Sequence, residues 1–294
     1  MPTSPMDVWG QARVVTPHTV PSRMTLFRDR LMLKVDTFTW VPKKDAVDKA
    51  YTALKPAVRF SLEDVVELPP VINRTIQVDL GPKQAKAYEE LRSVAKTMVE
   101  QHEITAVNAG AAMSKMLQVS LGWVYRSDGK IVALDCQPRL DAMMDIINSA
   151  QNKVLVFAPY RHVLRGISRE LNKHKIEHGP IDGSAPNKKR NEVFSIFQNT
   201  DKFQVLPAHP QCLAHGLTLT VADTIIWFGP ISSYETYEQA NHRITRIGQT
   251  KKQQIIRLSG TPVERRLYGL LDTKQDRQDT FLQMFADATA ERLR

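Results

Sequence analysis

Cysteine is nearly absent from this chain of 294 residues, and so are long apolar runs. The only two cysteines, Cys136 and Cys212, lie far apart and have no His or Cys partner at metal-ligand spacing, which excludes a disulfide framework and a zinc site. No apolar segment approaches the roughly 18 residues that a membrane span requires, and the first residues do not resemble a signal peptide. The sequence therefore predicts a soluble protein without a membrane partner or a bound metal, located in the cytoplasm.

Acidic residues are too few to balance the basic ones. Lys and Arg number 40 against 31 Asp and Glu, which gives a net charge of +9. A basic surface favours a polyanionic partner such as nucleic acid, because contacts with phosphates release counterions. Since 42% of the residues are hydrophobic, the chain is also expected to bury a core, as one large or two modest domains.

The first part of the chain lacks regular periodicity. Residues 1–75 are interrupted by segments such as TPHTVPS, WVPKK and ELPP, with short helices expected near residues 5–15 and 44–54 and no compact core. After them, residues 81–104 begin with Gly-Pro and carry apolar residues at helical spacing, which predicts a long helix. A second helix is expected at 109–119, followed by a hairpin in GWVYRSDGKIVAL, where Asp-Gly supplies the turn.

Short apolar runs alternate with helical patterns from residue 140 onward. The runs are KVLVFAP, FQVLPA, TIIWFG and QQIIRLS, and helical segments of ordinary length lie between them. This alternation is typical of a parallel sheet covered by helices on both faces, so residues 137–275 are predicted to form an α/β domain. In such sheets ligands bind beyond the carboxyl ends of the strands, where the polar motifs are therefore expected.

The segment QANHRITRIGQT places two arginines near the end of an expected helix. If that helix starts near Tyr234, then Gln239, Arg243 and Arg246 share one face beside an apolar stripe. Spacing alone favours an ordinary solvated face. Gly248 predicts the end of the helix, however, and the glutamine after it adds a hydrogen-bonding group beside the arginines.

A second polar segment, LAHGLTLTVADTIIWFG, lies just upstream. Thr218, Thr220 and the backbone around Gly216 are placed to hold a phosphate without a formal charge, and Asp223 is placed to cap the next element or bind an arginine. Taken alone, the segment also fits a simple turn with β-branched residues.

Two further segments carry polar residues next to strands. In IDGSAPNKKR, Ser184 belongs to a turn and Arg190 lies within the first turns of a helix. Tyr160, Arg161 and His162 follow the apolar run KVLVFAP, which fits a contact with a phosphate or a base. Each of these segments alone also fits an ordinary surface turn or capped helix.

Together and in this order, the segments resemble the second RecA-like lobe of superfamily-two helicase-like ATPases of the Swi/Snf type. KVLVFAPY resembles motif IV of that family, IDGS resembles the element after it, AHGLTLTVADTIIWFG resembles motif V and QANHRITRIGQT resembles motif VI. GTPVERRLYGLLDTK and RFSLEDVVELPPVINRTIQVDLGPKQAKAYEEL resemble flanking segments of the family. The resemblance covers nearly the whole chain and is closest to the compact helicases of phages, which would place the protein in a host cytoplasm.

The resemblance also implies how the chain is divided. A RecA-like α/β lobe follows a mostly helical extension. The implied parts are a remnant of lobe one with the inter-lobe linker (1–80), a helical extension with a β-hairpin (81–136), the helicase C-terminal lobe (137–275) and a C-terminal helix (276–294).

The function implied by the resemblance is an ATP-dependent DNA helicase or translocase. ATP with magnesium would lie between two lobes, and the arginines matching Arg243 and Arg246 would stabilise charge on the γ-phosphate. Gln239, Gly216 and Asp223 are the implied nucleotide contacts. The implied contacts with DNA, expected to be duplex, are Tyr160, Arg161, Ser184, Arg190, Thr218 and Thr220.

Two nucleotide motifs of the first lobe are absent from the sequence. It contains no G-x-x-x-x-G-K-S/T loop and no Asp-Glu pair. ATP hydrolysis is therefore expected only with a lobe-one polypeptide supplied in trans, and the start of the chain beyond the position of motif III favours a split gene, a truncated frame or an internal start. Two alternatives stay open: a non-catalytic DNA-binding or regulatory module derived from a helicase, and an inactive remnant.

Overall fold

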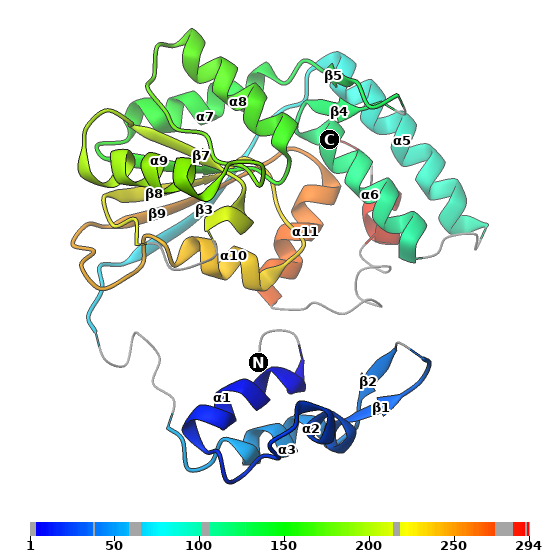
Figure 1. Cartoon of the computed structure of the whole chain (residues 1–294). Coiled ribbons are helices and arrows are strands. Elements are labelled where there is room, and N and C mark those ends of the chain that lie inside the picture. Colours follow the sequence, from blue (N-terminus) through cyan, green and yellow to red (C-terminus); the bar gives the residue numbers. More distant parts are fainter. Residues whose placement is uncertain are drawn as a thin grey trace. The chain divides into compact units, whose positions relative to one another are not determined.

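The chain divides into two compact units, Met1–Glu67 and Leu68–Arg294 (Figure 1). No helix among the described residues is long and apolar enough to cross a membrane. The computed structural model describes residues 4–37, 39–58, 66–101, 106–126, 128–213, 218–273, 285–291 and 293.

The first unit has a small apolar core of its own. Phe27, Leu31 and Ala50 are buried together, and the Thr16 hydroxyl donates to the Ala53 carbonyl at 2.7 Å. The expectation of no compact core here was wrong, because helices that are each too short to bury an apolar face converge and bury those faces jointly. The elements are η1 (Pro5–Asp7), α1 (Val8–Val15), α2 (Met24–Leu31), β1 (Met32–Lys34), β2 (Trp40–Pro42) and α3 (Ala46–Ala53).

The second unit is built on a five-stranded parallel sheet, which confirms the predicted α/β class. The strand order is β3-β9-β8-β6-β7, and every neighbouring pair is parallel. Strands β6, β7, β8 and β9 coincide with the four predicted apolar runs. The bounds are β3 (Val71–Gln77), β6 (Lys153–Phe157), β7 (Val205–Ala208), β8 (Ala222–Trp227) and β9 (Gln253–Ser259).

The edge strand β3 was not predicted from the sequence. It pairs with β9 along its whole length, from Val71 opposite Gln253 to Gln77 opposite Ser259. Five of its seven residues are exposed, so it lacks the continuous apolar run of a strand buried on both faces. The sheet therefore includes residues that the sequence analysis assigned to the irregular start and linker.

Helices cover both faces of the sheet (Figure 1). Val156 of β6 belongs to the core beneath α7 and α8, whereas its neighbour Leu155 belongs to the core beneath α9 and α10, as alternating side chains require. Residues of α11 enter both cores. The bounds are α7 (Gln137–Ser149), α8 (Arg161–Lys173), α9 (Asn187–Asn199), α10 (Tyr234–Asn241) and α11 (Pro262–Thr273).

The predicted helical extension and hairpin are confirmed. Gly129 occupies the hairpin turn with a φ of 77°, a backbone conformation that favours glycine. The hairpin packs on α8 at Gly166, where an added Cβ would lie only 2.2 Å from the Trp123 ring. The elements are α5 (Pro82–Glu100), α6 (Ala106–Ser120), β4 (Trp123–Tyr125) and β5 (Ile131–Ala133).

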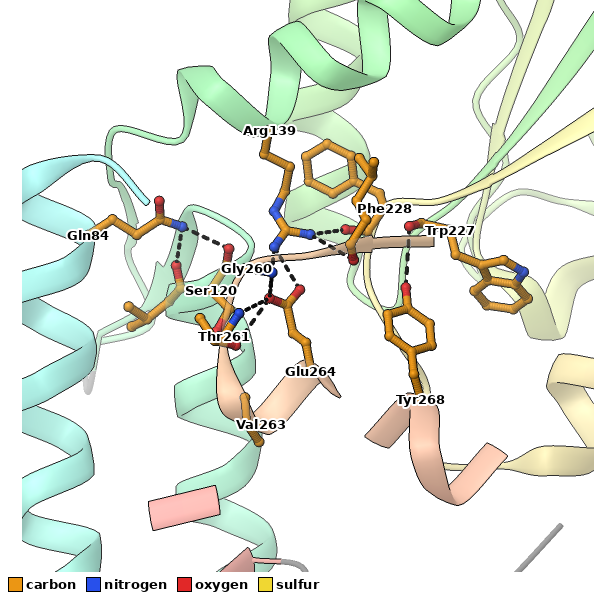
Figure 2. A network of polar contacts seen from close by, with 12 residues as sticks. Gln84, Ser120, Arg139, Trp227, Phe228, Gly260, Thr261, Val263, Glu264 and Tyr268 are labelled. Atoms are coloured by element: carbon orange, nitrogen blue, oxygen red, sulfur yellow. Dashed lines mark hydrogen bonds and ion pairs between the residues drawn. The ribbon is translucent and has the colours of Figure 1, made fainter. Parts of the chain in front are cut away.

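A buried ion pair joins α7 to α11 (Figure 2). The Arg139 and Glu264 side chains are 2% and 0% exposed and approach to 2.8 Å. Arg139 also donates to the carbonyl of Phe228, just after β8, at 2.6 Å. Glu264 accepts from the N–H groups of Gly260 and Thr261 at 2.9 and 3.0 Å, which caps the first turn of α11. Both charges therefore have partners inside the protein.

The same network continues into the helical extension. The hydroxyls of Thr261 and Ser120 are 3.0 Å apart, and Gln84 of α5 donates to the Val119 and Ser120 carbonyls at the end of α6 at 2.8 and 2.7 Å (Figure 2). Gly260 is needed for this close packing, since an added Cβ would lie 2.6 Å from the carbonyl oxygen of Val78. One polar cluster thus holds the extension against the carboxyl edge of the sheet.

Glu264→Ala is expected to lower the free energy of unfolding by about 3–5 kcal/mol, because it leaves the Arg139 charge buried without its counter-ion. Chemical denaturation of the full chain measures the change. The control is Glu100→Ala, which removes the carboxylate of an exposed pair with Lys96 and should cost less than about 1 kcal/mol. Equal losses in the two variants would contradict the role assigned to the buried pair.

Candidate nucleotide and DNA site

The segment QANHRITRIGQT does not form the continuous helix that was predicted. α10 ends at Asn241, and the Arg243 carbonyl accepts a hydrogen bond from the N–H of Leu219 at 2.9 Å. Gly248, predicted to end the helix, instead lies in a separate turn with a φ of 97°. The prediction was wrong because hydrogen bonds to the segment before β8 replace those that would continue the helix.

Gln249 anchors this turn to the sheet. Its buried amide donates to the carbonyls of Ala222 and Ile244 at 3.0 and 3.2 Å, and the Thr245 hydroxyl donates to the Gln253 side chain at 2.5 Å. Ala222 and Gln253 are the first residues of β8 and β9, so the arginine segment lies at the amino edge of the sheet. The expectation that this motif would lie at the carboxyl edge was wrong.

Arg243 and Arg246 lie close enough for the charge of Arg246 to act on Arg243. Arg243 is buried, with its Nε donating to the Gln239 carbonyl at 3.0 Å, and Arg246 donates to the Thr218 hydroxyl at 3.2 Å. Burial, and then the charge of Arg246, lower the pKa of Arg243. An anion bound beside both groups would offset these effects. Thr220 is half-buried and lies two residues after Thr218, just before β8.

The side chains of Gln239 and Asp223, two other predicted nucleotide contacts, make hydrogen bonds to residues outside the arginine turn. The Gln239 amide donates to Glu235 at 2.9 Å, within α10. Asp223 lies near the start of β8 and accepts from the Asn152 amide at 2.6 Å, so it is at the same edge as the arginines. Gly216 lies outside the described residues.

Three of the predicted DNA contacts gather at the opposite, carboxyl edge. Asp182 accepts from Arg161 Nε at 3.2 Å, from the N–H of Ser184 at 2.8 Å and from the Ser184 hydroxyl. Arg190 donates to the Gly183 carbonyl at 3.2 Å. From the sequence, Asp182 was expected only to belong to the turn that contains Ser184. The sequence Asp-Gly-Ser indicates the organising role of Asp182, because the side chain of an aspartate in such a turn commonly accepts a hydrogen bond from the backbone N–H two residues later.

Tyr160 and His162 pack against each other at this edge. The Tyr160 hydroxyl lies 3.2 Å from that of Ser114, and its ring stacks on His162 with centroids 5.4 Å apart. His162 is buried, is hydrogen-bonded to the Trp123 carbonyl at 2.9 Å and has its pKa lowered by that burial. The suggested phosphate or base contact by His162 was therefore wrong, because its ring is part of the packing.

A pocket of about 400 Å³ opens beside these residues. It lies between α6 and the loops that follow β6, β7 and β8, so it is at the carboxyl edge. Its polar lining is uncharged apart from the titratable His209. The polar side chains that line it are Ser114, Tyr160, His209, Gln211, Ser232, Ser233 and Thr236.

Residues 138–248 match the helicase conserved C-terminal domain. The chain is 27% identical over 214 residues to an uncharacterized ATP-dependent helicase of Mycoplasma genitalium, covering 71% of this chain and 21% of that protein. It is 33% identical over 116 residues to SWI/SNF-related matrix-associated actin-dependent regulator of chromatin subfamily A-like protein 1 of Xenopus tropicalis, covering 40% and 12%.

This chain carries a helicase conserved C-terminal domain and is similar to Swi2/Snf2-type helicases. The Swi2/Snf2 ATPase core of Sulfolobus solfataricus, solved in complex with dsDNA, shares the fold with a TM-score of 0.58 and 19% identity, over 83% of this chain and 53% of that one. A phage relative, from Acyrthosiphon pisum secondary endosymbiont phage 1, is 25% identical over 86% of this chain. The chain spans 21% of the Mycoplasma relative and 54% of the phage relative.

Asp182→Asn is expected to destabilise this helicase C-terminal lobe at neutral pH but not in acid. Burial raises the pKa of Asp182, but the hydrogen bonds from Ser184 and Arg161 outweigh burial, so the pKa is lowered overall. A carboxylate with a lowered folded pKa stabilises the fold above its unfolded pKa of about 3.9, and that contribution is lost as the pH falls through the folded value.

Denaturation midpoints of the wild type and Asp182→Asn should therefore differ near about pH 7 and converge toward about pH 3. The control is Asp145→Asn on the exposed face of α7, which should leave the midpoint unchanged near neutral pH. A gap between wild type and Asp182→Asn that is equally wide at both pH values would contradict the prediction.

Proposed function

We propose that this lobe completes the ATP site of a DNA translocase, with Arg243 and Arg246 acting on the γ-phosphate. The observation that carries the proposal is the anchored arginine turn at the amino edge. Buried Gln249 fixes the turn to β8, while Ile247, between Arg246 and Gly248, is 68% exposed. The turn is therefore fixed at its base and open to solvent at its tip, where a second lobe would meet it.

The chemistry of the two side chains suits a triphosphate. Phosphoryl transfer spreads negative charge over the γ-phosphate oxygens, and a guanidinium donates to two such oxygens from one rigid plane. Arg246 uses one nitrogen on Thr218, and this hydroxyl contact is one that a phosphate oxygen would replace. The chain has no phosphate loop and no Asp-Glu pair, so the triphosphate cradle and the magnesium carboxylates would come from a first lobe.

We further propose that duplex DNA binds at the carboxyl edge, on the cluster around Arg161, Ser184 and Arg190. The dsDNA present in the Sulfolobus structure supports this partner. After β7 the chain forms η2 (Pro210–Leu213) at the carboxyl edge, and Thr218, which precedes β8, lies beside Arg246.

Arg246→Ala is expected to reduce DNA-stimulated ATP turnover about a thousand-fold or more in the presence of a complementary first lobe, because it removes charge stabilisation in the transition state. The measurement is phosphate release by the full chain mixed with a first-lobe polypeptide and duplex DNA. The control is Arg266→Ala, an exposed arginine of α11, which should keep full turnover.

Full turnover by Arg246→Ala would refute the assigned role. Salt-dependent DNA binding with no ATPase rescue by any matching first lobe would instead favour the non-catalytic DNA-binding module.

Arg190→Gln is expected to weaken duplex DNA binding equally for all sequences and to lower the slope of log affinity against log salt by about one, because it removes one phosphate contact. Arg266→Gln is the control for loss of one exposed arginine. An unchanged slope for Arg190→Gln would contradict DNA binding at the carboxyl edge.

A further inference from the structure

Four cations lie in a row on the exposed face of α8. Arg161, Arg165, Arg169 and Lys173 follow one another at four-residue intervals, and all four are exposed. We refer to these residues as the α8 basic row. The opposite side of the helix packs on the sheet through Val163, Leu164, Ile167 and Leu171.

Only the two ends of the row have a structural task. Arg161 pairs with Asp182 at 3.2 Å, and Lys173 pairs with Glu170 at 3.2 Å near the helix C-terminus, where a cation also stabilises the helix dipole. Within the part of the chain that the structure describes, Arg165 and Arg169 take part in no ion pair or hydrogen bond. Their charges are therefore not needed to hold α8 in place.

The middle of the row in fact opposes folding slightly, because like charges one helical turn apart repel. Lys115 of α6 adds a further positive charge close by. After the effect of burial, the charges of Lys115 and Arg165 both lower the pKa of His162, which lies beneath them. Because Arg165 and Arg169 have no ion-pair partner among the described residues, the middle of the row would gain from an external polyanion.

We infer that the α8 basic row binds the phosphate backbone of duplex DNA and extends the DNA-binding surface beyond the carboxyl edge. Four residues of helix rise about 6 Å, which is close to the separation of successive phosphates along a strand. The row starts at Arg161, inside the proposed DNA cluster, and runs along α8 away from it. The inference rests on the proposed DNA contact at that edge, but not on the ATPase role of the arginine turn.

The residues between the cations favour a nucleic acid over a lipid surface. No large apolar side chain of α8, all of whose residues the structure describes, is exposed, whereas helices that bind membranes interleave their cations with large apolar groups. Guanidinium groups also suit phosphates, which they contact through two parallel hydrogen bonds. The row is therefore assigned to phosphate contacts that carry no base preference.

The test is a salt titration of duplex DNA binding by the full chain. The double variant Arg165→Gln/Arg169→Gln should lower the slope of log affinity against log salt by about two, equally for unrelated sequences. Arg165→Lys/Arg169→Lys should keep the slope. Lys83→Gln/Lys86→Gln, which removes two exposed lysines of α5, is the matched control and should also keep it.

Folding is checked in the same variants. Arg165→Gln/Arg169→Gln should have a melting temperature equal to or above that of the wild type, since it relieves repulsion. The inference would be overturned by an unchanged slope, or by an equal loss of slope in the α5 control. It would also be overturned if the α8 variant bound anionic vesicles more weakly but DNA as well as the wild type. If Arg190→Gln lowers the slope but the α8 variant does not, DNA binding at the edge stands and the basic row fails.

Discussion

The buried pair of Arg139 and Glu264 is the interaction on which the carboxyl edge depends. Removing two charges from water is costly, and here that cost is offset because each charge is paired with the other and hydrogen-bonded to the backbone. Arg139 pairs with Glu264 and donates to the Phe228 carbonyl, while Glu264 accepts from the backbone N–H groups at the start of α11. Through Thr261 the pair also reaches α6, so the strand ends and the helical extension keep one geometry. The proposed DNA surface lies on the loops that this edge fixes.

The two groups of predicted site residues lie at opposite edges of one sheet. The arginine turn is tied to the amino ends of β8 and β9 by Gln249 and Thr245, whereas Asp182 gathers Arg161 and Ser184 at the carboxyl edge. A parallel sheet lies between these two sets of residues.

The central strands and long helices could be predicted because burial dictates their composition. β6 is apolar along its length because both faces are covered, and α5 begins with Gly-Pro because proline suits a first helical turn. The edge strand β3 and the end of α10 at Asn241 could not be predicted. β3 is half solvated, and α10 ends where Leu219, distant in sequence, and Gln249, a few residues further on, supply competing hydrogen bonds. The family motifs singled out Arg243 and Arg246, but the edge of the sheet on which these arginines lie was predicted wrongly.

The most direct test of the account is a structure of this lobe bound to a complementary first lobe, duplex DNA and a transition-state analogue of ATP. The account predicts that the Arg246 guanidinium leaves the Thr218 hydroxyl and lies about 3 Å from an oxygen of the γ-phosphate mimic. A complex in which the nucleotide is bound while Arg246 stays on Thr218, away from the phosphates, would contradict it.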